Sequence, residues 1–121
     1  MFDGGRRDAR RGEAASQYRQ EKVKSNDLRE QIELDVRVAL DSLHSAEEQL
    51  RVAEQGLAQA DREMTQARRR YQGGVSNSLE VSDAQNRLEH ARDNQISALF
   101  NHNLARIDLG LALGSVSDFI Q

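Results

Sequence analysis

Alanine recurs at every seventh residue in two stretches of the sequence, and no other feature restricts the possible fold as strongly. The first series is Ala39, Ala46, Ala53, Ala60 and Ala67, and the second is Ala84, Ala91, Ala98, Ala105 and Ala112. In the first series a larger side chain follows each alanine by four residues, as Leu43 and Leu50 do. A 3.5-residue spacing held over several heptads is typical of helices that coil around each other.

The two series match each other when one of them is reversed. If Ala67 lies opposite Ala84, the same register places Ala39 opposite Ala112. The larger side chains of the second series, which precede its alanines by three residues, then lie opposite those of the first series. Facing alanines allow two helices to approach closely. The sequence therefore predicts an all-α fold, a long antiparallel coiled-coil helical hairpin with unequal arms.

Glycine pairs suggest where the helices begin and end. Gly4-Gly5 lies near the start of the sequence and Gly73-Gly74 lies in the middle. Glycine is common at the position just after a helix ends, so the second pair indicates the end of the first helix. Asn77 is expected to cap the second helix, with Glu80 completing a capping box. Residues 1–121 are thus expected to form a single hairpin with four parts: a long helix at about 8–72, a tip turn at 73–78, a second helix at about 79–113 and a short tail at 114–121.

Two surfaces of this hairpin have no partner within the chain. The shorter arm reaches back only to about residue 37, so residues 8–36 have no helix to pack against. The second helix also carries an apolar stripe away from the alanine seam: Ile96, Phe100, Leu104, Ile107 and Leu111. An exposed stripe of this size favours contact with another chain, and we expect the hairpin to self-associate through it.

Composition and motifs exclude most kinds of chemistry. The chain has no cysteine, hence no disulfide and no zinc-thiolate site. No stretch reads as a membrane-spanning helix, and no signal peptide is expected at the start. His44, His90 and His102 form no metal-binding or catalytic motif, so we expect no enzyme activity, no metal and no cofactor. The basic Arg68-Arg69-Arg70 run lacks interleaved aromatic residues, so a nucleic-acid partner is not expected.

The turn between the helices is less polar than a simple connection requires. Val75 and Leu79 lie at its tip, and the acidic Glu80 and Asp83 follow just inside the second helix. One interpretation is a local hydrophobic staple that holds the turn together. The other is a surface that binds a partner.

At the tip the sequence resembles the C-terminal repeat of the outer-membrane efflux proteins, the TolC-like outer-membrane factors. The resemblance rests on Arg70-Tyr71 with Gly74, on the segment from Leu79 to Gln85, and on the segment from Asn103 to Gly114. The opening Met1-Phe2-Asp3-Gly4-Gly5 is similar to the family's segment between the last barrel strand and the long helix. The resemblance covers nearly the whole chain.

This resemblance implies a trimeric tube in which an outer-membrane β-barrel continues into a periplasmic α-barrel. The hairpin would belong to that α-barrel, at the cell outer membrane and in the periplasm, within a tripartite efflux or type I secretion system. The implied partners are a periplasmic adaptor (membrane-fusion) protein, an inner-membrane pump and further copies of the same channel. The chain would meet the membrane only through the β-barrel strands that it lacks, and alone it is expected to be soluble.

The resemblance also implies roles for residues at the tip. The residues that match the adaptor-docking tip are Gly73, Gly74, Val75, Ser76 and Leu79. Glu80 and Asp83 match positions where acidic side chains ring and narrow the pore, and Tyr71 matches a residue that ties neighbouring helices closed. Two alternatives stay open at this point: a free-standing coiled-coil interaction module, and the hairpin of a periplasmic adaptor protein.

Overall fold

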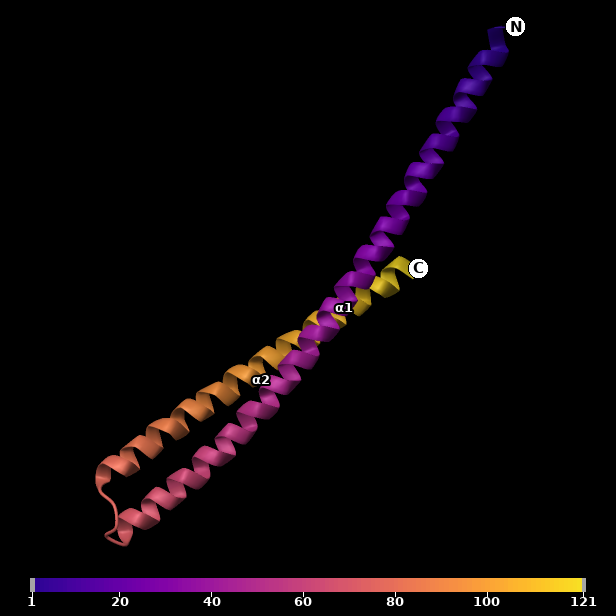
Figure 1. Cartoon of the computed structure of the whole chain (residues 1–121). Coiled ribbons are helices and arrows are strands. Elements are labelled where there is room, and N and C mark those ends of the chain that lie inside the picture. The colour runs from indigo at the N-terminus through magenta and orange to yellow at the C-terminus, as the bar shows by residue number, and fades with distance from the viewer. Residues whose placement is uncertain (1, 121) are drawn as a thin grey trace.

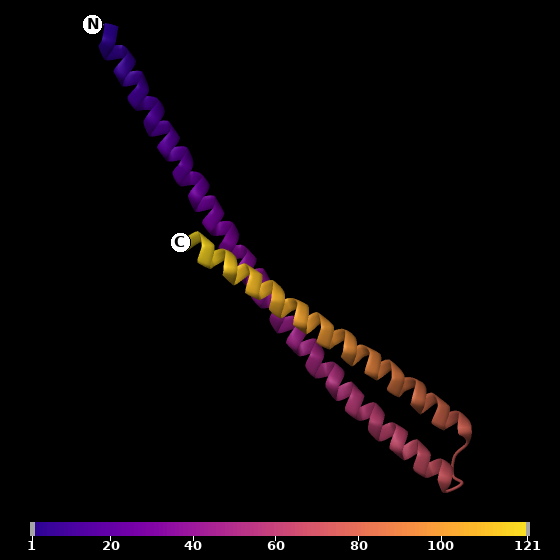
Figure 2. The ribbon, with the colours of Figure 1, turned by 180° about the vertical axis from the view of Figure 1, so that it is seen from behind.

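Two long α-helices form the whole described structure, a computed structural model that covers residues 2–120. Helix α1 spans Phe2–Gln72 and helix α2 spans Ser78–Ile120, and residues 73–77 join them. The two helices run antiparallel and side by side from the closed end (Figures 1 and 2). No strand occurs between residues 2 and 120. The predicted all-α helical hairpin is confirmed.

The buried side chains lie on the predicted alanine seam between the helices. The buried residues are Ala39, Ala46, Ala60, Met64, Ala67, Ala84, Leu88, Ala98 and Ala105. The tightest packing is near the closed end, where Met64 and Leu88 contact alanines of both helices and Ala84 has 0% of its surface exposed. Because most of these side chains are small, close approach of the backbones takes the place of a large apolar core.

Both helices are longer than the sequence predicts. Helix α1 begins at Phe2 rather than at about residue 8, so it passes through Gly4-Gly5, and α2 continues through the expected tail to Ile120. A glycine costs a helix only about 1 kcal/mol, and the chain has no proline to end either helix. At the far end Val116 is half-buried and shares a hollow with Ile32, which favours continuation of α2. Met1 and Gln121 lie outside the described residues.

The arms are unequal, as predicted, and the excess length belongs to α1. Helix α2 ends partway along α1, and the N-terminal part of α1 extends beyond it without a neighbour (Figure 1). We call residues 5–31, every one of which is exposed, the overhang; at its inner end Arg29 still lines a hollow together with Val116 of α2. At 1.5 Å per residue the overhang is about 40 Å long. The apolar seam is interrupted there, since Arg29, Ser25 and Lys22 occupy the next heptad positions beyond Ile32 and Val36.

Polar side chains occupy two positions of the seam on α2. Gln95 and His102 are both half-buried there. The His102 Nε2 atom lies 3.9 Å from the Glu47 Oε1 atom, at the outer limit of an ion pair. A polar residue in such a seam specifies register at a cost in stability.

Replacing His102 by leucine is therefore expected to stabilise the hairpin. The side chain of His102 is only 19% exposed, so a leucine there gains about 1 kcal/mol from burial and raises the melting temperature by about 5 °C. Thermal unfolding followed by circular dichroism measures the change. His44→Leu is the matched control, because His44 is exposed and its replacement leaves the melting temperature unaltered. A lower melting temperature for His102→Leu would contradict this account of the seam.

Candidate functional site

The closed end of the hairpin turns sharply through a glycine-based helix cap. Gly74 has a φ angle of +73°, the only positive φ in residues 2–120. The Val75 N–H donates to the Arg70 carbonyl at 2.9 Å, and the Gly74 N–H donates to the Tyr71 carbonyl at 3.1 Å. These two bonds form a Schellman motif. Any side chain at position 74 would strain the backbone there.

Asn77 begins α2 as the sequence predicts, but Glu80 acts differently. The Asn77 Oδ1 atom accepts a hydrogen bond from the Glu80 N–H at 3.2 Å, which is the expected N-cap. The Glu80 carboxylate does not complete a capping box within the described hydrogen bonds. It accepts a hydrogen bond from the Ser76 hydroxyl and lies 3.3 Å from the Arg70 Nε atom. Glu80 therefore links the end of α1 to the start of α2.

The pairing of Arg70 with Glu80 at the tip was not predicted from the sequence. The Arg70 guanidinium and the Glu80 carboxylate are 47% and 39% exposed, so the pair contributes only about 0.5 kcal/mol. The sequence signal for this pairing was the presence of opposite charges on the two sides of the turn. The pairing itself depends on the loop geometry, which brings side chains ten residues apart in the sequence together.

The apolar side chains of the tip are not covered by the chain itself. Val75 is 72% exposed and Leu79 is 64% exposed. In a Schellman motif the residue at the position of Val75 usually contacts the helix it follows, and here it leaves most of its surface to solvent. This exposure contradicts the local hydrophobic staple. The closed end of the molecule thus presents two largely exposed apolar side chains.

Two further predicted site residues, Tyr71 and Asp83, lie exposed beside the tip. The sequence placed Tyr71 in the seam, but 52% of it is exposed. The reason is its position in the last turn of α1, beyond the outermost buried pair, Ala67 and Ala84. Asp83 is also exposed. Neither side chain takes part in a hydrogen bond or ion pair that the structure describes.

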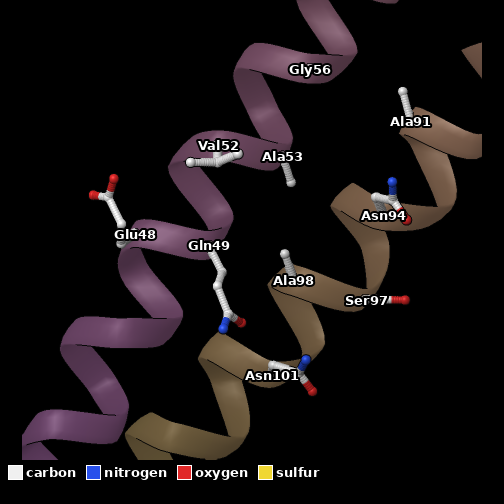
Figure 3. A pocket seen from close by; sticks show the side chains of 10 residues that line it. All are labelled: Glu48, Gln49, Val52, Ala53, Gly56, Ala91, Asn94, Ser97, Ala98 and Asn101. Atoms are coloured by element: carbon white, nitrogen blue, oxygen red, sulfur yellow. The ribbon is translucent and has the colours of Figure 1, made fainter.

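A shallow groove follows the two helices halfway along the hairpin. It has a volume of about 560 Å³, and Ala53 and Ala98 point toward each other across it (Figure 3). Most of its lining is small or neutral: Gln49, Val52, Gly56, Ala91, Asn94, Ser97 and Asn101. Glu48 lies at its edge, where the hydrogen bond from Arg51 lowers the pKa of that carboxyl. The groove contains no paired acid and base, so it offers shape rather than reactive groups.

The described part of the chain contains no cluster of side chains suited to a metal ion. Neither α1 nor α2, as described, has a segment both long and apolar enough to cross a membrane. The fold and the tip define a helical hairpin that offers exposed surfaces for contact.

Comparison with known proteins assigns this hairpin to a family. The model of the outer membrane efflux protein family matches residues 1–115. This match covers nearly the whole chain, so the protein belongs to the outer membrane efflux protein family, whose members are channel components for transport and not enzymes. A search of curated proteins found no match, and neither did a search of solved structures.

Proposed function

We propose that the chain supplies one hairpin to the wall of the periplasmic α-barrel of an outer-membrane channel, in a tripartite efflux or type I secretion system. The family assignment supports a channel component rather than the hairpin of an adaptor. The unpartnered surfaces support a place within a larger assembly. These are the overhang on α1 and the apolar stripe on α2, whose residue Phe100 is 62% exposed.

The tip is the docking surface for a periplasmic adaptor, through Gly73, Gly74, Val75, Ser76 and Leu79. The observation that carries this proposal is the exposure of Val75 and Leu79 at the closed end. The Schellman motif and the Asn77 cap satisfy the backbone locally, so the loop is held in one shape without using these two side chains. A rigid surface with an apolar centre binds without a large loss of conformational entropy.

The acidic residues beside the tip narrow the entrance of the pore. Glu80 is already paired with Arg70, so its charge is largely offset. Asp83 is exposed and carries most of the negative potential that remains. Copies of Asp83 around a common axis would attract cations and repel anions.

Contacts between copies close the channel at the level of the acidic residues beside the tip. Tyr71 lies at the end of α1 with about half of its surface exposed, and it ties neighbouring helices together. The assembly is a homotrimer, and the inner-membrane pump joins it through the adaptor. These partners are proposed from the family resemblance. The exposure of Tyr71, Val75 and Leu79 supports contacts with them.

Replacing Val75 by asparagine is expected to weaken adaptor binding at least about tenfold, because a buried valine contributes about 1.5 kcal/mol. The measurement is titration calorimetry of the full chain with purified hairpins of the host's periplasmic adaptors. Asparagine at this position leaves the backbone turn unaffected, since the φ constraint lies at Gly74.

Val23→Asn is the matched control, because Val23 is 56% exposed on the overhang, far from the tip. It is expected to bind adaptors like the unchanged chain. Equal binding by both variants would contradict docking through the tip. Absence of binding to every adaptor would favour a free-standing interaction module.

A further inference from the structure

The end of α1 that lies farthest from the tip carries a concentration of arginine. We call it the basic end, and its members are four exposed side chains: Arg6, Arg7, Arg10 and Arg11. Asp8 and Glu13 are the acidic residues between positions 5 and 18, so four positive charges against two negative ones leave this segment a net charge of +2. Along the axis of α1, Arg10 lies about 90 Å from Arg70 at the tip. The basic end is therefore a surface separate from the tip.

The arginines of the basic end are spaced so that they repel each other. Two pairs are separated by four residues, a spacing that makes side chains neighbours on a helix: Arg6 with Arg10 and Arg7 with Arg11. Further along α1 the same spacing brings opposite charges together, since the Arg29 Nε atom lies 3.8 Å from the Glu33 Oε1 atom. No ion pair described within residues 5–120 involves the basic end. An anionic ligand would relieve this repulsion.

We propose that the basic end binds the phosphate headgroups of an anionic lipid surface. The direction of this contact rests on the proposed function: when the tip meets an adaptor in the periplasm, the opposite end of α1 points toward the outer membrane. The family resemblance does not by itself imply a lipid contact for these helices. The charge and spacing of the arginines supply the argument for it.

A lipid surface suits the dimensions of the basic end. The helix rises about 7.5 Å from Arg6 to Arg11, and charges in physiological salt act over about 8 Å. All four guanidinium groups therefore lie within reach of the negative potential when the end of α1 meets a membrane. The acidic Glu21 lies about 22 Å from Arg6 along the axis, so screening removes most of its repulsion by the surface. For the same reason, the net charge of -3 of the whole chain does not prevent the contact.

Nucleic acid fits the basic end less well than lipid does. Proteins that bind single strands combine basic residues with aromatic ones, and the residues between these arginines are Asp8 and Ala9. A helix in the major groove of a duplex meets phosphates over several turns, which would bring acidic residues such as Glu21 into the negative field. A planar surface is met by the end of the helix alone, and this favours lipid.

Co-sedimentation of the full chain with vesicles of phosphatidylglycerol and phosphatidylcholine in equal amounts tests the proposal. Each basic residue near an anionic surface strengthens binding about fivefold. Arg10→Gln with Arg11→Gln is therefore expected to weaken binding about 25-fold. Glutamine preserves helix propensity, so the helicity by circular dichroism is expected to be unaltered. Vesicles of phosphatidylcholine alone are expected to bind little of the chain, and so are anionic vesicles in about 1 M salt, where the screening length falls to about 3 Å.

The matched control is Arg68→Gln with Arg69→Gln. It removes the same charge from two exposed arginines close to the tip, and it is expected to bind vesicles like the unchanged chain. Equal weakening by the two double variants would show a diffuse attraction and overturn the proposal. Absence of binding to the anionic vesicles, or tighter binding of the chain to a single-stranded RNA than to them, would overturn it as well.

Lipid binding and adaptor docking are tested separately by these variants. Arg10→Gln with Arg11→Gln is expected to bind adaptor hairpins like the unchanged chain, because the substitutions lie about 90 Å from the tip. If the chain binds vesicles through these arginines and binds no adaptor, the docking function is wrong and the lipid contact stands. If the chain binds an adaptor and no vesicle, the lipid contact is wrong and the docking function stands.

Discussion

Replacing Ala84 by leucine is expected to lower the melting temperature of the hairpin by about 10 °C. Ala84 has 0% of its surface exposed and packs within the cluster that contains Met64, Ala67 and Leu88. A leucine adds three carbon atoms where the helices touch most closely. It must either take a strained rotamer or push the helices apart, at a cost of about 2 kcal/mol.

Thermal unfolding by circular dichroism measures this effect, and two other alanines provide the comparison. Ala58→Leu is expected to leave the melting temperature nearly unaltered, because Ala58 is exposed and alanine and leucine have similar helix propensities. Ala53→Leu is expected to have a smaller effect than Ala84→Leu, since Ala53 is half-buried and lines the groove, which has room for the larger side chain. Equal melting temperatures for all three variants would show that the register of the seam is wrong.

Amide hydrogen exchange is expected to divide α1 into two parts that differ about a thousandfold in protection. The overhang has no buried side chain, and most of the stability of a protein helix comes from packing of its apolar face. Its amides exchange through local fraying. The amides near Ala60 and Ala67 exchange only when the packed hairpin opens, because those residues belong to the core cluster.

Hydrogen exchange followed by mass spectrometry of peptic fragments resolves the two parts within one sample. Addition of trifluoroethanol, which favours helix without requiring packing, is the control and is expected to reduce the difference. Strong protection of the overhang in plain buffer would mean that it packs against another segment or another copy.

The sequence was sufficient to predict the seam but not the ends of the helices. The alanine repeat is a long-range periodic signal, and the buried residues, from Ala39 to Ala105, lie on it. Helix ends depend instead on small local differences. Gly4-Gly5 looked like a boundary, yet the cost of two glycines is smaller than the tendency of an unbroken helix to continue.

The tip was predictable in its residues and not in its contacts. The residues Gly74 and Asn77 act as the sequence predicts, because each has a conformational or capping property of its own. The contact between Arg70 and Glu80 arises only once the turn has its shape, and so does the exposure of Tyr71. Their positions depend on how the two helices leave the loop, which no local sequence rule specifies.

The position of the turn between the two helices also determines the order in which the hairpin folds. Arg70 and Glu80 are close in the sequence, whereas Ile32 and Val116 are separated by most of the chain. Bringing distant residues together costs more loop-closure entropy than bringing near ones together. Pairing of the helices therefore begins at the tip and proceeds toward the open end. Changes near the tip mainly slow folding, and changes near the open end mainly speed unfolding.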